Sequence, residues 1–243
     1  MRCAPMRCIL YIVLCLTPCA GFSYHTCMIR HFMRRPFRYE FFNAALIIIL
    51  FNAGIFLLFS LSSPYTQSRI LRTFALIPVL VRSGSLWQLV SYMFLHGNMS
   101  HLFFNMLGIF FFGTQIERHM GSKEFLLFYF VCGTVAGLFS FAVYMLSGVQ
   151  GIVLIGASGA IYGILLAFAA FFPHAEIYVF GIIPIRAPIL VIIYACIEIF
   201  NQVAGTREGV AHLTHLAGFA AAYVYLLLRY RINALHVFFG RRR

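Results

Sequence analysis

The stretch GASGAIYGILLAFAAFF, residues 156–172, places a serine between small residues at the start of an apolar run of helical length. A second apolar stretch, residues 210–229, contains His212-Leu213-Thr214-His215-Leu216-Ala217-Gly218 near its start. Polar side chains at membrane depth are costly unless they are paired or have a function. We therefore predict that Ser158 and a histidine of the second stretch meet as a catalytic pair inside the bilayer.

The composition is that of a membrane protein. The chain has 243 residues, of which 62% are hydrophobic and 10% charged, far from the usage of soluble domains. Runs of about 20 apolar residues can span a bilayer. We predict an all-α bundle of six transmembrane helices near residues 42–61, 99–116, 124–147, 157–172, 184–200 and 210–229. The long connection from Ser62 to Val90 is expected to lie at the membrane interface.

The net charge of +12 comes from arginines that flank the apolar runs. Arg34, Arg35 and Arg38 precede the first predicted span and several arginines follow the sixth, so both termini are predicted to be cytoplasmic, as in a bacterial inner-membrane protein. Basic residues in the first long loop oppose this orientation only in part. Contact with anionic lipid is expected, whereas no folded domain presents the basic runs to nucleic acid.

This orientation predicts that the polar residues of three spans share one depth. The second, fourth and sixth spans would all run from the outside to the inside. With a rise of about 1.5 Å per residue, His101, Ser158 and His215 would then lie in the outer third of the membrane.

The two ends of the chain differ from the predicted domain, residues 34–232. Residues 1–33 are either a signal-like or disordered segment or lie upstream of a translation start at Met28 or Met33. The later start is preferred, because a cleaved signal would put the arginine cluster on the wrong side. Residues 233–243 are predicted to form a basic cytoplasmic tail.

Cysteine and acidic residues exclude several chemistries. None of the seven cysteines forms a Cys-x-x-Cys pair, and Cys132 and Cys196 are expected to be small core residues, so we expect no disulfide framework and no metal site. All six acidic residues are Glu, which excludes a paired-aspartate protease and a Ser-His-Asp triad. We therefore expect a Ser–His dyad, in which Tyr162 packs against the histidine and replaces the missing Asp.

Ser158 has suitable surroundings for a nucleophile. Gly156 would allow a sharp turn before the helix, and the amides at a helix start suit an oxyanion. The alternative is an ordinary serine N-cap.

Small residues recur four apart on both helices, at Gly159 and Gly163 and at Gly218 and Ala222. This spacing predicts that the two helices approach closely, and the register favours His215 as the partner of Ser158. The roles of His212 and Glu198 stay open.

The second predicted span carries His96-x4-His101-x3-Asn105. His101 and Asn105 are four apart and face the same way, and both can donate hydrogen bonds to an oxyanion. Metal binding by the histidines is the competing interpretation.

At these residues the chain resembles the rhomboid family of intramembrane serine proteases. The matching pieces are Gly156-Ala157-Ser158-Gly159, Tyr162, His96-x4-His101-x3-Asn105, His215 with Gly218, and Gly113-x3-Glu117-Arg118-x2-Gly121.

The resemblance implies a Ser158–His215 dyad in a cavity that opens outward, with His101, Asn105 and the Ser158 amide as the oxyanion hole. It implies supporting roles for Gly156, Gly159, Tyr162, His96 and Gly218. It also implies single-span membrane proteins as substrates and no cofactor. The chain departs from the family at Trp87-Gln88, where the family has Trp-Arg, and this puts the anchoring of the first loop in doubt.

Two other functions remain open. A relative without activity would bind transmembrane helices in the same groove and would not need the dyad. A small transporter would use Glu198 as a buried acid, although the chain lacks an internal repeat.

Overall fold

Apolar helices make up most of the chain from Pro36 onward. The computed structural model describes residues 36–149, 151–179, 181–204 and 209–240, so the predictions for residues 1–33 lie outside the described residues. Three helical runs among the described residues are long and apolar enough to cross a membrane. They are α3 (Ala44–Leu61), the run of α7 (Met99–Gly108), η2 (Ile109–Gly113) and α8 (Thr114–Met120), and α9 (Ser122–Leu146).

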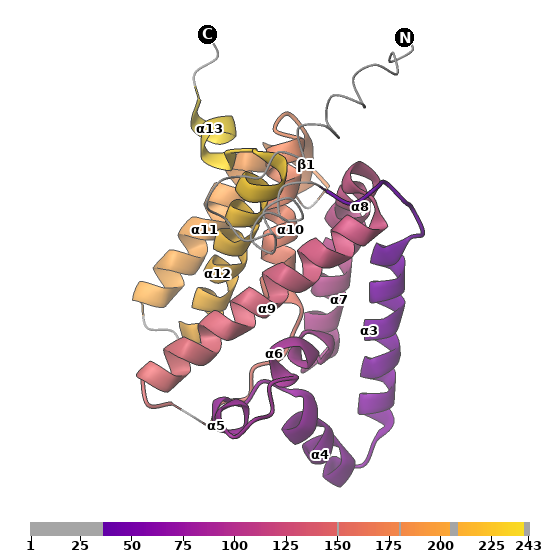
Figure 1. Cartoon of the computed structure of the whole chain (residues 1–243), viewed down its shortest axis with the longest axis vertical. Helices are drawn as coiled ribbons and strands as arrows, with labels where there is room; N and C mark the ends of the chain where they lie inside the picture. The colour runs from indigo at the N-terminus through magenta and orange to yellow at the C-terminus, as the bar shows by residue number, and fades with distance from the viewer. Residues whose placement is uncertain (1–35, 150, 180, 205–208, 241–243) are drawn as a thin grey trace, which may run out of the picture. The chain divides into compact units, whose positions relative to one another are not determined.

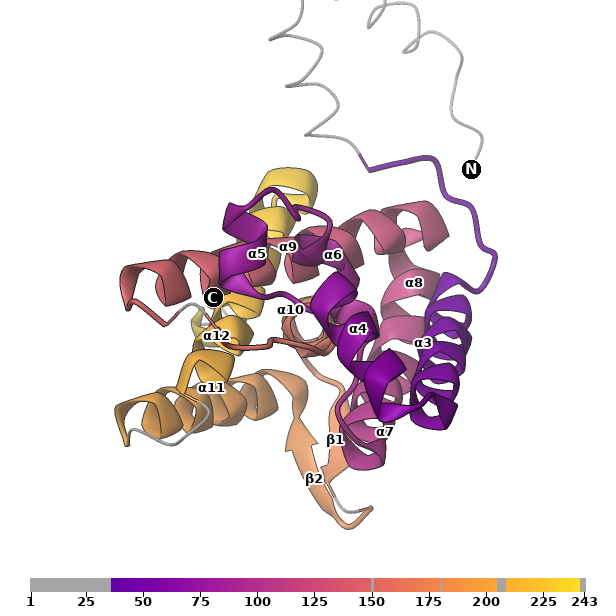
Figure 2. The ribbon, with the colours of Figure 1, turned by 90° about the horizontal axis from the view of Figure 1, so that it is seen from below.

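The other three predicted spans correspond to shorter helices. These are α10 (Ser158–Phe171), α11 (Ala187–Val203), and α12 (Gly209–Tyr225) with its π-helical continuation η3 (Leu226–Tyr230). In Figures 1 and 2, α10 lies in the middle of the bundle, with α9, α11, α12 and α7 around it. Most of its residues are buried, as expected for a helix that is apolar on every side.

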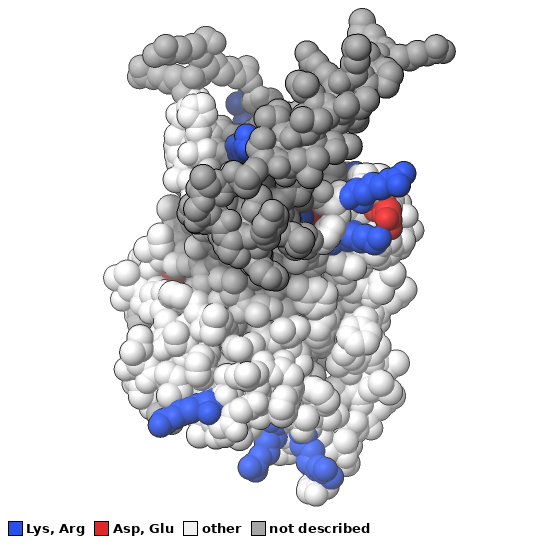
Figure 3. Space-filling view, viewed as in Figure 1, with Lys and Arg blue, Asp and Glu red and all other residues white. Residues whose placement is uncertain are grey.

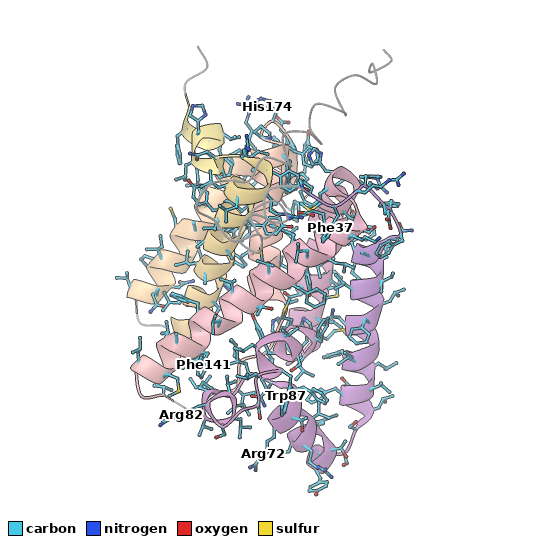
Figure 4. All side chains as sticks on the ribbon, viewed as in Figure 1. Phe37, Arg72, Arg82, Trp87, Phe141 and His174 are labelled. Atoms are coloured by element: carbon cyan, nitrogen blue, oxygen red, sulfur yellow. The ribbon has the colours of Figure 1, made fainter. Side chains whose placement is uncertain are left out.

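The connection between α3 and α7 is helical for much of its length. It contains α4 (Pro64–Phe74), α5 (Pro78–Arg82), α6 (Gln88–Ser91) and the single 3₁₀ turn η1 (Tyr92–Phe94). Ser63 begins α4 as its N-cap, because its hydroxyl accepts a hydrogen bond from the Thr66 amide. Figure 4 shows Trp87 and Arg72 in this region, at the opposite end of the bundle from Phe37 and His174.

Gln88 anchors this connection. Its side chain is fully buried and accepts a hydrogen bond from the amide of Ile77, with a N···O distance of 3.1 Å. Its amide group donates to the carbonyls of Arg72 at 2.8 Å and Thr73 at 3.2 Å. The neighbouring Trp87 indole also donates to the Thr73 carbonyl, at 2.8 Å. Glutamine at the position where the family has arginine thus links α4, α5 and α6 through hydrogen bonds.

At the other end, buried carboxylates tie α3 to α8 and α9. Glu117 of α8 accepts hydrogen bonds from the amides of Ala44 at 2.5 Å and Ala45 at 2.9 Å, and from the hydroxyl of Ser122. A carboxylate at a helix N-terminus satisfies free amides and interacts favourably with the helix dipole. The Glu117 motif therefore fixes the start of the first long helix.

Glu124 forms a second buried contact at the same end. Its carboxylate accepts hydrogen bonds from the guanidinium of Arg229 at 2.7 Å and 2.5 Å, from the Tyr225 hydroxyl at 2.5 Å and from the Phe37 amide at 3.0 Å. A buried charge is tolerated when it is paired and hydrogen-bonded in this way. The pair links the start of α9 to the end of the α12–η3 helix.

The structure corrects the sequence predictions at three places. The fold is not all-α, because β1 (Glu176–Val179) and β2 (Ile183–Arg186) form an antiparallel hairpin between α10 and α11. Two four-residue strands are too short to give a clear alternating pattern. The predicted tail contains the short helix α13 (Ala234–Phe239), capped by Asn233. Cys196 is exposed on α11, whereas Cys132 is buried as expected.

Charge is distributed as expected for a membrane-embedded bundle. On the face drawn in Figure 3, the lysines and arginines of the described residues gather at the two ends, and the surface between them is almost entirely white. Large exposed apolar side chains such as Leu50, Leu58, Phe104 and Phe200 lie on α3, α7 and α11. In water such a surface would be a liability, but in lipid it is the expected exterior.

We predict that Gln88→Ala destabilises the protein by about 1–3 kcal/mol, because buried backbone groups of the α4–α6 connection lose their partners. The midpoint of thermal unfolding in detergent should fall. The matched control is Gln115→Ala, because Gln115 is exposed. Equal midpoints for the two variants would contradict the anchoring role.

Candidate active site

Ser158 is the first residue of α10, and the backbone just before it turns sharply. Gly156 has φ +119°, a conformation that favours glycine. Its amide donates to the Tyr92 carbonyl at 2.9 Å, and Leu154 pairs with Leu76 through two 3.0 Å backbone hydrogen bonds. The segment that leads into Ser158 is therefore held against the α4–α6 connection.

His101 approaches this turn closely. A Cβ atom at Gly156 would lie 2.6 Å from His101 Nε2, so a larger residue would displace the imidazole. His101 is in the first turn of α7, which Asn98 caps by accepting the His101 amide at 2.8 Å. The imidazole thus lies beside the backbone two residues before Ser158.

Ser158 and His215 are in hydrogen-bond contact. Ser158 Oγ and His215 Nε2 are 2.8 Å apart, although the residues are 57 positions apart in the sequence. The contact depends on the close approach of α10 and α12, since a Cβ atom at Gly218 would overlap the Gly159 carbonyl. The sequence predicted this close approach from the small residues on the two helices.

Tyr162 lies one turn beyond Ser158 and stacks on the imidazole. The rings of Tyr162 and His215 are nearly parallel, with an interplanar angle of 6° and centroids 4.2 Å apart. Phe219 contacts the tyrosine from α12, with centroids 5.0 Å apart. The plane of the His215 ring is therefore fixed by packing.

The expectation of a pair without a carboxylate partner is wrong. Glu198 of α11 is buried with its Oε1 atom 2.9 Å from His215 Nδ1 and its Oε2 atom 2.5 Å from His212 Nδ1. The Tyr162 hydroxyl donates to the same carboxylate. The absence of Asp from the chain excludes an aspartate beside His215, but a glutamate can take that place. Glu198 was considered from the sequence solely as a transporter residue, since nothing local indicated which way it faced.

A second polar contact links α12 to α9. The hydroxyls of Thr214 and Ser140 are 2.5 Å apart, which joins α12 to α9 next to His215. Both residues are buried. Sequence reasoning missed this pair, and the only available signal was the occurrence of single hydroxyl residues in apolar helices.

His101 and Asn105, the two proposed oxyanion-hole residues of α7, lie in different surroundings. His101 lies at the Ser158 turn, whereas the Asn105 amide donates to the His101 carbonyl of its own helix at 2.7 Å. Within the described part of the chain, Asn105 is therefore near-buried and hydrogen-bonded to α7 rather than to Ser158.

His96 is buried just before α7, outside the candidate membrane spans. Its ring lies edge-on to that of His101, with centroids 5.1 Å apart. Burial, together with the neighbouring His101, lowers the pKa of His96 to about 4. The ring is therefore neutral near pH 7, and its contact with His101 gives it a packing role.

A metal ion is the other species that this cluster could hold. One potential ligand atom from each of Glu198, His212 and His215 lies within 4.8 Å of the others. Two imidazoles and a carboxylate are a usual ligand set for zinc. The distances between these atoms bear on whether they bind a metal ion or one another.

The fold and the site define a helical membrane protein with a serine–histidine contact between two closely packed helices. A family profile described as Rhomboid domain matches residues 83–232, more than half of the chain. The chain therefore belongs to the rhomboid family, and it is an integral membrane protein.

Individual relatives match different shares of the chain. RHOMBOID-like protein 12, mitochondrial, from Arabidopsis thaliana is 28% identical over 196 residues, 75% of this chain and 57% of that protein. Putative rhomboid protease YdcA from Bacillus subtilis is 36% identical over 84 residues, 35% of this chain and 40% of that protein. Rhomboid protease GluP from the same organism is 37% identical over 86 residues, 35% and 16% respectively. The chain thus spans little more than half, or less, of the length of these relatives.

We predict that Gly218→Ala destabilises the bundle by about 1–3 kcal/mol, because the added methyl group forces α12 away from the Gly159 carbonyl. Thermal unfolding in detergent measures the effect. Gly54→Ala is the matched control, since a Cβ atom at Gly54 of α3 would have no neighbour within 4 Å. If Gly218→Ala unfolds at the same temperature as Gly54→Ala, the close approach is not needed for stability.

Proposed function

We propose that this protein is an intramembrane serine endopeptidase with Ser158 as nucleophile and His215 as general base. The observation that carries the proposal is the 2.8 Å contact between Ser158 Oγ and His215 Nε2. A nucleophile within hydrogen-bond reach of a base, which is itself held by a third group, is the arrangement that activates serine. The names of two bacterial relatives, YdcA and GluP, support the same activity.

The reaction is acyl transfer. His215 takes the Ser158 proton while Oγ attacks a peptide carbonyl, and the protonated ring then gives this proton to the leaving amine. Water then attacks the acyl-enzyme. His215 takes a proton from this water and returns it to Ser158 Oγ as the acyl group leaves. The charge on the tetrahedral oxygen would be stabilised by the Ser158 amide at the start of α10, by His101 and by Asn105. Asn105 has a second amide proton to offer besides the one bonded within α7.

The proposal includes the six-span topology. α3, the α7–α8 run, α9, α10, α11 and α12–η3 would cross the membrane, with both termini in the cytoplasm of a bacterial cell. The α4–α6 connection would then lie outside, at the end where Ser158 begins α10. Single-span membrane proteins, cut near the outer face, are the proposed substrates, and no cofactor is required.

A relative that only binds transmembrane helices is the alternative. It would need the bundle but neither the Ser158–His215 contact nor a reactive serine. Reaction of Ser158 with a fluorophosphonate, detected by mass spectrometry, supports the enzyme. A Ser158 that stays unmodified while the protein binds single-span helices supports the alternative.

We predict that Ser158→Ala abolishes cleavage of a single-span substrate in reconstituted vesicles and that Asn105→Ala lowers the rate by about 10²–10³, the usual effect of removing one oxyanion donor. Ser68→Ala is the control, because Ser68 is an exposed residue of α4. Cleavage at the wild-type rate by Ser158→Ala would refute the assignment.

A further inference from the structure

Three polar groups surround the Glu198 carboxylate, and they suit its ionised form. Its Oε1 atom receives the Tyr162 hydroxyl and faces His215 Nδ1 at 2.9 Å, and its Oε2 atom faces His212 Nδ1 at 2.5 Å. An ionised carboxylate is only an acceptor, whereas a protonated one would place its own proton against one of these donors. Glu198 is only 4% exposed, so its ionised carboxylate needs hydrogen-bond partners inside the protein.

The same contacts favour one tautomer of His215. To take the Ser158 proton, Nε2 must carry no hydrogen in the resting enzyme. The proton of the neutral ring is then on Nδ1, the atom that lies 2.9 Å from Glu198 Oε1. If the ring lacked this acceptor, either tautomer could form and one of them could not accept the serine proton.

We propose that Glu198 is a positioning residue that acts through His215 and completes a Ser158–His215–Glu198 triad. The inference rests on the proposed function. Glu198 holds the Nδ1–H tautomer before the reaction and stabilises the imidazolium once Nε2 has received the serine proton. Glu198 stays ionised throughout, and the transferred proton leaves on the amine product.

His212 and Tyr162 have a part in this arrangement. Tyr162 fixes the plane of the His215 ring by stacking and also donates to Oε1. His212 contacts Oε2 from the preceding turn of α12, and this contact restrains rotation of the carboxylate away from His215. This gives His212 a role as the second anchor of Glu198.

The distances favour hydrogen bonds over a metal centre. Ligand atoms bound at about 2.0–2.1 Å to a tetrahedral zinc ion lie roughly 3.3 Å from one another. The contacts from Glu198 to His215 and His212 are shorter than that, at 2.9 Å and 2.5 Å. Both distances are in the range of hydrogen bonds.

Kinetics of the protein in vesicles test the proposal, with a single-span substrate and the variants Glu198→Gln, Glu198→Asp, Ser158→Ala and Glu176→Gln. Glu198→Gln should lower kcat by about 10⁴, the size of effect known for replacing the acid of a serine protease triad, and leave KM unchanged. Glu198→Asp should restore part of kcat, because it keeps the charge. Glu176→Gln removes an exposed carboxylate of β1 and should match the wild type.

The outcomes separate this inference from the proposed function. If wild type cleaves no faster than Ser158→Ala, the protease assignment fails. If wild type cleaves and a folded Glu198→Gln has the same kcat, only the role of Glu198 fails. Loss of wild-type activity on chelation, with recovery on adding ZnCl₂, would overturn the hydrogen-bonded arrangement in favour of a metal site.

A spectroscopic measurement on the unaltered chain covers the case in which Glu198→Gln does not fold. Nitrogen-15 chemical shifts of histidine distinguish a protonated Nδ1 from a protonated Nε2, and the signal of His215 can be assigned with a His215→Gln variant. The resting protein should show Nδ1–H at His215. A resting Nε2–H tautomer would overturn the proposal.

Discussion

The close approach of α10 and α12 is the constraint on which the site depends. At Gly159 and Gly218 the two backbones meet with no room for a side chain between them. Only at this separation can a serine hydroxyl on one helix reach an imidazole on the other at 2.8 Å. Lipid offers no hydrophobic drive between helices, so close van der Waals packing of this kind is what holds them. Ser158 and His215 are thus positioned by two glycines that take no part in the chemistry.

Buried polar groups do the remaining positioning, at both ends and in the middle of the bundle. Gln88 binds the α4–α6 connection, Glu117 the start of α3, Glu124 the end of α12–η3, and Glu198 the histidines. Each satisfies several partners at once, because an unpaired polar group in an apolar interior is expensive. Of the six acidic residues of the chain, three are buried in this way, which suggests that acids are kept here for specific contacts rather than for solubility.

Much of the fold could be predicted from the sequence, because hydropathy and helical spacing are local properties. The helices lie within a few residues of their predicted bounds, and the choice of His215 over His212 as the neighbour of Ser158 followed from the register of Gly218. The hairpin β1–β2 was missed because its strands are too short to show a period. The contact of Glu198 was missed because a single acid in an apolar helix does not indicate which neighbour it faces.

The sequence by itself determined that the chain lies in a membrane and which serine and histidine could meet, since composition and helical rise are set residue by residue. Only the tertiary structure decided that the carboxylate of Glu198 lies against the far side of His215 and that Gln88 can anchor a loop without an arginine. Contacts between helices depend on the rotation of each helix about its axis. That rotation is set by the packing of all the helices together, and no single segment encodes it.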